Sequence, residues 1–148
     1  MKMLQKICFV LLLGTFSSVY GGSCWDEVSD VDDCRMKAEQ GNSLTPVILG
    51  GLYERGQGVI QDYKEAVKWY RKSAEQGHSK AQYNLGLMYA KGQGVLQDYA
   101  MAHMYFNIAS VSGDKDAIKG RYLVEEQMTR SQLEKAQDLA REWMRTHQ

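Results

Sequence analysis

Apolar residues in the middle of the chain recur at the spacing of an amphipathic helix. A helix is predicted over residues 79–91. Its apolar residues, which share one face, are Ala81, Leu85, Met88 and Tyr89. Ser79 is expected to cap this helix, with Gln82 completing a capping box. Gly92 and Gly94 are expected to end it, because glycine adopts backbone conformations that other residues resist.

A second helix is predicted just before the first. Asp62 is placed to cap it, Glu65 follows three residues later, and the helix is expected to run to about Gln76 and stop at Gly77. Its inward residues are Ala66, Val67, Tyr70 and Ala74. An earlier helix is expected to have Pro46 in its first turn, where the amide is unpaired in any case. The helix that contains Pro46 and the helix that follows Asp62 form a helical hairpin.

The hairpin pattern occurs twice. The segment GQGVIQDY at 56–63 returns as GQGVLQDY at 92–99, which is 36 residues later. The same offset relates Leu49-Gly50 to Leu85-Gly86. A period of this length is typical of a repeat protein, in which each unit packs only on its neighbours. The sequence therefore predicts a stack of helical hairpins.

The flanking segments carry weaker traces of the same period. Residues 38–41 repeat at 74–77, so the chain is expected to open with a lone second helix. Thr129 is expected to cap a final helix with Gln132 three residues on. The inner face of that helix is expected to hold Leu133, Ala136, Ala140, Trp143 and Met144, with Arg141 and Arg145 outward. We expect seven helices.

The expected organisation has five parts. Residues 22–40 form an N-terminal segment and capping helix, 41–76 the first repeat, 77–112 the second repeat, and 113–148 a C-terminal capping helix pair. Residues 1–21 are expected to be a signal peptide, because lysines at 2 and 6 precede an apolar run and a small-residue stretch. The apolar run is shorter than the about 20 residues of a membrane span. A periplasmic or secreted location follows, with a retained N-terminal anchor as the alternative.

The net charge of the chain indicates which classes of partner to expect. Without residues 1–21 the count is 18 minus 2, or 16 basic residues against 18 acidic ones, a formal charge of -2. Nucleic-acid binding needs a net basic face and is not expected. The acidic cluster Asp26, Glu27, Asp30, Asp32 and Asp33 suits the positive end of a helix dipole. Its spacing does not match a calcium-binding loop. The mature chain is not expected to insert into a membrane.

Cysteine usage predicts one disulfide. Cys8 leaves with the signal peptide, and Cys24 and Cys34 remain as a pair in an oxidising compartment. Ten residues of helix would hold the two Cα atoms about 15 Å apart, while a bridge needs less than about 7 Å. The helix must then begin late, with Ser29 as its cap. Lipidation of Cys24 and free or intermolecular thiols are the alternatives.

The repeated pattern resembles a known family. Leu-Gly-x-x-Tyr-x-x-Gly-x-Gly-Val-x-x-Asp-Tyr-x-x-Ala-x-x-Trp-Tyr, at 49–70, resembles the Sel-one-like repeat, a relative of the tetratricopeptide repeat. The second copy has Tyr105-Phe106 where the first has Trp69-Tyr70. The resemblance covers about residues 38–147, and the tail from Ala117 to Trp143 also resembles the closing helices of small exported bacterial members. It implies an all-α, right-handed α-solenoid that acts as a scaffold for protein partners.

The resemblance also suggests where a partner binds. In tetratricopeptide-like stacks the first helix of each unit lines the concave side. The candidate partner-binding residues are Tyr83, Asn84, Leu87 and Lys91 in the second copy, and Val47, Ile48, Gly51 and Arg55 in the first. Tyr, Asn and Lys offer aromatic contact and hydrogen bonds to a peptide. Packing of Tyr83 and Leu87 on the neighbouring unit is the alternative.

The residues do not indicate an enzyme. His78, His103 and His147 lack metal-ligand spacing, and the Gly-x-Gly turns follow helices and lack the lysine of a phosphate loop. No cofactor or metal is expected. Cysteine-rich relatives described as β-lactamase-like carry a disulfide in each repeat, but this chain has no cysteine after Cys34. The predicted function is a non-catalytic scaffold of the bacterial cell envelope. A homo-oligomeric structural protein and, more weakly, a cell-wall or β-lactam hydrolase are the alternatives.

Overall fold

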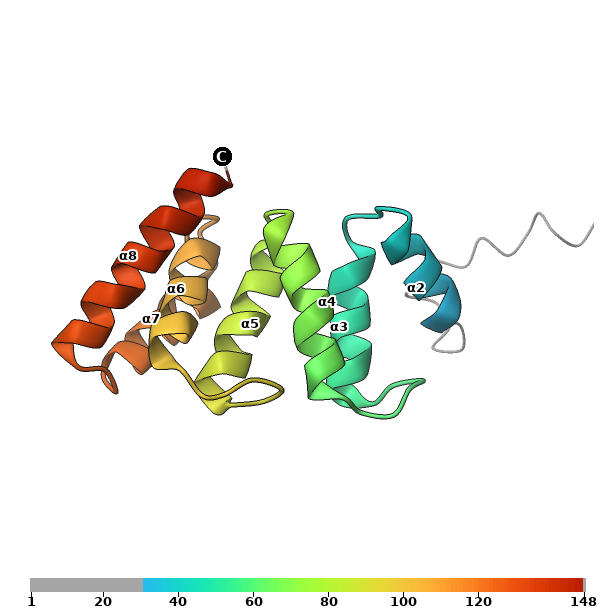
Figure 1. The fold of residues 1–148 in the computed structure, drawn as a ribbon, viewed down its shortest axis with the longest axis horizontal. Coiled ribbons are helices and arrows are strands. Elements are labelled where there is room, and N and C mark those ends of the chain that lie inside the picture. The colour runs from blue at the N-terminus through green and yellow to red at the C-terminus, as the bar shows by residue number, and fades with distance from the viewer. Residues whose placement is uncertain (1–30, 148) are drawn as a thin grey trace, which may run out of the picture.

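The computed structural model describes residues 31–147, which form seven α-helices and no strand (Figure 1). The helices are α2 (Val31–Glu39), α3 (Thr45–Arg55), α4 (Tyr63–Glu75), α5 (Ser79–Lys91), α6 (Tyr99–Ser110), α7 (Lys115–Glu125) and α8 (Arg130–Thr146). They follow one another along the long axis of the molecule, from α2 at one end to α8 at the other. The predicted all-α solenoid is confirmed. The predicted signal peptide, Cys24 and Ser29 lie outside the described residues.

Side-chain caps begin the helices where the sequence predicted them. The Asp62 carboxylate accepts from the amides of Lys64 and Glu65 at 2.8 and 3.1 Å. Asp98, its counterpart one repeat later, caps α6 in the same way. At α8 the Thr129 and Gln132 side chains form the full capping box. The starts of α4, α6 and α8 are therefore fixed by local chemistry, and the predicted caps at Asp62 and Thr129 are confirmed.

The capping box expected at Ser79 and Gln82 was wrong. Ser79 is the first helical residue of α5, and the N-cap is His78, whose side chain makes no capping hydrogen bond. The Gln82 side chain is only 4% exposed, and its amide nitrogen lies 3.3 Å from the carbonyl oxygen of Ala74 on α4. Gln82 therefore links two helices and cannot turn back to the start of its own.

Glycine allows the two helices of each hairpin to approach closely. A Cβ atom on Gly50 of α3 would lie 2.5 Å from the Tyr70 ring of α4, and one on Gly86 of α5 would lie 2.6 Å from the Phe106 ring of α6. Tyr70 and Phe106 are each 1% exposed. The aromatic rings therefore rest on bare backbone at the centre of both hairpins.

In the first repeat the buried aromatic ring also carries a polar link. The Tyr70 hydroxyl donates to the Glu54 carboxylate at 2.6 Å. Burial raises the pKa of Tyr70 well above its usual range, and the neighbouring Glu54 carboxylate adds to the rise. The hydroxyl therefore stays protonated, as the hydrogen bond to Glu54 requires. Phe106 replaces this tyrosine in the second repeat, where the contact is purely apolar.

Arginine and tyrosine connect successive units at the repeat period. Arg35 of α2 donates to the Tyr53 hydroxyl of α3. Arg71 of α4 donates to the Tyr89 hydroxyl of α5 at 3.1 Å. Each link joins the second helix of one unit to the first helix of the next, so it holds the units in register.

The loop of the second repeat also packs on the first. Gly94 has a φ angle of +71°, and a Cβ atom there would lie 2.2 Å from the carbonyl oxygen of Tyr63, at the start of α4. Only glycine fits both the backbone conformation and the space. This loop therefore connects α5 to α6 and also packs against the start of α4 in the preceding hairpin.

The last helix closes the stack by covering α6, although α7 lies between them in the sequence. Ala136 and Ala140 of α8 are fully buried, while Trp143 and Met144 are partly buried against the core. Arg141 and Arg145 face outward and pair with Asp138 and Glu142, as part of the expected polar outer side. The predicted inner face is confirmed at Ala136, Ala140, Trp143 and Met144 and the outer face at Arg141 and Arg145, while Leu133 is half-buried.

His103 is buried between α6 and α7. It is 3% exposed, and its Nε2 atom lies 3.8 Å from a carboxylate oxygen of Glu125. Burial lowers the pKa of His103, an effect that Glu125 opposes and Arg121 reinforces. The histidine is therefore an interhelical core residue that is neutral at pH 7.

Two adjacent glycines of α3 test the close approach of the hairpin helices. Gly50→Ala forces a methyl group into the buried Tyr70 ring. Overpacking of about 3 kcal/mol exceeds the about 1 kcal/mol that alanine gains over glycine in a helix, so we expect the free energy of unfolding in urea to fall by about 2 kcal/mol. Gly51→Ala is the control, because its methyl group meets only the flexible end of Arg55. Equal effects of the two substitutions would contradict this packing.

The buried histidine predicts a pH dependence of stability. Because the pKa of His103 is lower in the folded state than its ordinary value of 6.5, the unfolded chain binds the proton more tightly. The free energy of unfolding should be fully maintained above pH 6.5 and fall as the pH drops below it. His103→Gln should flatten this part of the pH profile, while replacing the exposed His147 with glutamine should not. An unchanged profile in the His103 variant would refute the prediction.

Candidate protein-binding surface

The predicted binding residues of the second repeat lie on α5, and two of them pack on the next helices. The Tyr83 ring lies 5.7 Å from the Phe106 ring, centroid to centroid. Leu87 packs beside Phe106 and Val124 in a small core cluster. Tyr83 therefore packs on the second helix of its own repeat, Leu87 packs on a cluster that also includes Val124 of α7, and a role of either residue in binding a partner stays a prediction.

The two polar candidates of α5 differ in their surroundings. Asn84 is half-buried and has the Tyr70 hydroxyl of α4 as a polar neighbour. Lys91 is exposed at the C-terminal end of the helix. Asn84 is thus near the junction of two units, while Lys91 is at the rim of the rod.

The predicted residues of the first repeat lie on α3. Val47 and Ile48 are half-buried and pack on the main core. Gly51 is buried beneath the guanidinium of Arg55, which is itself exposed and donates to the Gln57 side chain at 2.7 Å. The structure brings Gly51 and Arg55 together and places Val47 and Ile48 partly in the core.

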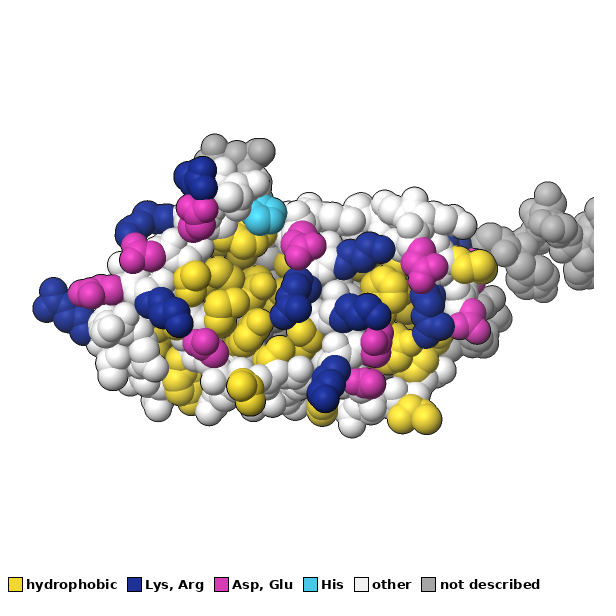
Figure 2. Space-filling view, viewed as in Figure 1, with side chains coloured by type: hydrophobic (Ala, Val, Ile, Leu, Met, Phe, Trp, Pro, Cys, Tyr) yellow, Lys and Arg dark blue, Asp and Glu magenta, His cyan; other side chains and the backbone are white. Residues whose placement is uncertain are grey.

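A cleft of about 510 Å³ lies elsewhere, between the second helices α2 and α4. It is lined by Arg35, Glu39, Tyr53, Glu65, Lys68, Trp69 and Lys72. Figure 2 shows a small hydrophobic area near α2 and α4 that is bordered by Lys and Arg side chains and by Asp and Glu side chains. Sequence reasoning considered only the first helices and missed this site.

Trp69 forms the apolar part of the cleft. The ammonium groups of Lys68 and Lys72 lie 5.9 and 5.5 Å from the centroid of its ring, within the range of cation–π attraction. Lys72 also donates to the carbonyl oxygen of Ala38 at the end of α2, at 2.9 Å. The indole Nε1 is buried and has no hydrogen-bond partner. The Trp69 ring therefore has two ammonium groups near it and an indole N–H without a hydrogen-bond acceptor.

Arg35 forms the opposite wall. It donates to the Tyr53 hydroxyl and pairs with Asp32 at 3.2 Å. The hydrogen bond to Tyr53 is the main cause that raises the pKa of Arg35. Glu65 pairs with Lys68 at 3.3 Å. The cleft therefore has an arginine bonded to Tyr53 and Asp32 on one side, and on the other two lysines bonded to Glu65 and to the Ala38 carbonyl oxygen.

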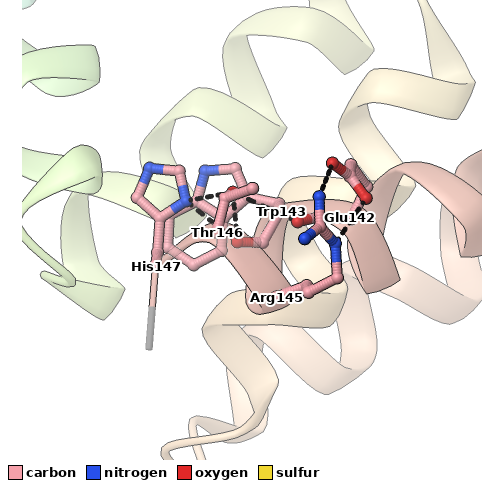
Figure 3. A network of polar contacts seen from close by, with 5 residues as sticks. All are labelled: Glu142, Trp143, Arg145, Thr146 and His147. Atoms are coloured by element: carbon pink, nitrogen blue, oxygen red, sulfur yellow. Dashed lines mark hydrogen bonds and ion pairs between the residues drawn. The ribbon is translucent and has the colours of Figure 1, made fainter.

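A second hollow of about 270 Å³ lies at the C-terminal end of α8, beside Ile108 and Val111 of the α6 end. Figure 3 shows the chain end there, with the His147 ring stacked on Trp143 at 4.1 Å between centroids. The His147 Nδ1 atom is 2.9 Å from both the Trp143 carbonyl oxygen and the Thr146 hydroxyl. These contacts tie the last described residue to the helix.

Residues 31–147 hold neither a metal-ligand cluster nor a membrane-spanning helix. No group of three or more His, Cys, Asp and Glu side chains in this range is arranged to hold a metal ion. No helix in the same range combines the length and apolar character needed to span a bilayer. Cys34 is buried in α2. Since Cys24 is not among these residues, the predicted disulfide stays a prediction.

Comparison with known proteins supports the repeat assignment. A family model described as the Sel1 repeat matches residues 48–78 and 79–114. A solved structure described as a protective antigen of uropathogenic Escherichia coli strains with an SLR fold is 33% identical, with a TM-score of 0.76. It is matched over 78% of this chain and 25% of its own length.

A second solved structure is similar over a shorter region. It is a Sel1 repeat protein from Oxalobacter formigenes, 38% identical, with a TM-score of 0.53 over 54% of this chain and 61% of its own. The chain thus spans a quarter of the first structure and about three fifths of the second. No curated protein matches it.

Proposed function

Residues 48–78 and 79–114 are two Sel1 repeats, and on this premise we propose that the protein is a non-catalytic scaffold that binds a protein or peptide partner. Sel1 repeats generally mediate protein–protein interaction and are typically non-catalytic. The observation that carries the proposal is the stack itself. Because each hairpin packs only on its neighbours, a solenoid leaves long side faces available for a partner.

The first helices offer one such face. On α5, Asn84 and Lys91 provide hydrogen-bond donors, and the Lys80 ammonium lies 5.5 Å from the centroid of the half-buried Tyr83 ring. On α3, Arg55 is exposed at the corresponding end of the helix. An aromatic edge with amide and cationic donors suits a peptide backbone or a carboxylate. We assign this face to partner binding.

The proposal includes export to the bacterial cell envelope or beyond it. The basic, apolar and small-residue order of residues 1–21 supports a cleaved signal peptide. The similar Escherichia coli structure is described as a protective antigen, which fits a protein that is accessible outside the cytoplasm. A periplasmic or secreted scaffold is the form of the function that these observations favour.

Two substitutions on α5 separate binding from packing. Asn84→Ala should reduce the yield of a partner crosslinked in the native envelope and identified by mass spectrometry, while helicity is kept and stability falls by no more than about 1 kcal/mol, the value of its contact with the Tyr70 hydroxyl. Tyr83→Ala should lower stability by about 1 kcal/mol, because it removes an aromatic pair with Phe106. Gln137→Ala, on the exposed side of α8, is the matched control. Equal crosslinking yields in the wild type, Asn84→Ala and Gln137→Ala would refute binding at this face.

Export has its own test. When the full chain is expressed in a bacterium, mass spectrometry of the envelope and medium fractions should find a product that begins at Gly22, within one or two residues. An intact N-terminus in those fractions would favour the retained anchor. Recovery only from the cytoplasm would refute export altogether.

A further inference from the structure

The same face of the second helix is used differently in the two repeats. On α6, residues Met101, Met104 and Ile108 are apolar, and α8 covers this helix. The positions 36 residues earlier on α4 hold Glu65, Lys68 and Lys72. These three line the cleft between α2 and α4. This face of the second helix is therefore open and charged in the first repeat, whereas it is apolar and buried in the second.

The lysines of this face are arranged to receive a negative charge. Lys68 and Lys72 are one helical turn apart, where like charges repel each other. Both ammonium groups also lie near the ring of Trp69, which keeps them on the same side of α4. Lys68 already pairs with Glu65, and Lys72 already donates to the Ala38 carbonyl oxygen, but each ammonium group has further N–H donors. A carboxylate placed between the two would relieve their repulsion and accept a charge-assisted hydrogen bond from each.

The rest of the cleft adds a bias in charge and an apolar floor. Three cations, Arg35, Lys68 and Lys72, line it against two carboxylates, Glu39 and Glu65, while Asp32 pairs with Arg35 from outside the lining. Trp69 is 6% exposed, and its Nε1 is a buried donor with no acceptor. A volume of about 510 Å³ is enough for a few side chains of a peptide. Charge complementarity therefore favours an acidic segment with an apolar neighbour.

We propose that the cleft between α2 and α4 binds an acidic segment of a protein partner, with a carboxylate between Lys68 and Lys72 and an apolar side chain against Trp69. This inference rests on the proposed scaffold function and adds a second site with a stated chemistry. It places the acidic segment on the second helices, away from the α3 and α5 face assigned above.

Fluorescence anisotropy of a labelled peptide tests the proposal on the full chain. The probe is a short fluorescein-labelled peptide of glutamate, alanine and leucine, and the comparison peptide has glutamine in place of glutamate. We expect the glutamate peptide to bind the wild-type protein and the glutamine peptide to bind much more weakly. Added salt should weaken the binding, because exposed ion pairs are screened.

Matched double substitutions locate the binding. Lys68→Gln with Lys72→Gln should weaken the glutamate peptide about tenfold, the combined value of two exposed ion pairs. Lys115→Gln with Lys119→Gln removes two exposed lysines at the same spacing on α7 and should leave binding unchanged. Circular dichroism checks that both variants remain helical.

The outcomes separate this inference from the proposed function. Absence of binding by the wild type up to about 1 mM peptide would overturn it. Equal losses in both double variants, or equal binding of the two peptides, would also overturn it. The crosslinking test at Asn84 can still succeed in each of these cases, so failure of the cleft does not imply failure of the scaffold.

Two other occupants are distinguished in the same assay. The chain has its own acidic segment before α2, and neutralising it by Asp26→Asn, Glu27→Gln and Asp30→Asn should not change peptide affinity. Tighter peptide binding by that variant would show that the segment fills the cleft and would overturn the choice of a partner. A dimer in sizing chromatography that the Lys68 and Lys72 substitutions dissociate would assign the cleft to a second copy, with the same consequence.

Discussion

The contact between a glycine backbone and an aromatic ring determines the geometry of this molecule. Tyr70 lies on Gly50 and Phe106 lies on Gly86, and neither site has room for even one methyl group. The missing side chain sets how close the two helices of a hairpin come, and therefore how the next hairpin must lie. Since core packing tolerates little change in volume, one residue in each unit fixes the shape of the unit.

Coupling between units combines a shared apolar core, which runs from α2 to α8, with polar contacts at the repeat period. Arg35 with Tyr53 and Arg71 with Tyr89 repeat the same bridge, and Gly94 lets a loop rest on the preceding hairpin. These contacts lie at the edges of the stack, whereas the glycine contacts lie at its centre. The result is a rod with rigid units, whose side faces are free to carry different chemistry.

Features that depend on neighbouring residues in sequence could be predicted, and features that depend on distant helices could not. Asp62 and Thr129 cap their helices as expected because capping is local. Gln82 did not cap α5, because a contact with Ala74 of another helix takes its side chain. The cleft was missed for a similar reason. Its signal was present in the contrast between Lys68 and its repeat counterpart Met104, but that contrast has meaning only once α8 is known to cover α6.

The position of α8 constrains how the chain could lengthen. Because α8 packs on α6, the second helix of the last repeat, α6 needs apolar residues on that face. Met101, Met104 and Ile108 supply them. An extra hairpin inserted after α6 would separate α8 from α6, so these apolar residues would be exposed and α8 would lose the surface on which it packs. Growth of the rod by duplication is therefore expected upstream of α5, with the three apolar side chains remaining as the mark of the terminal unit.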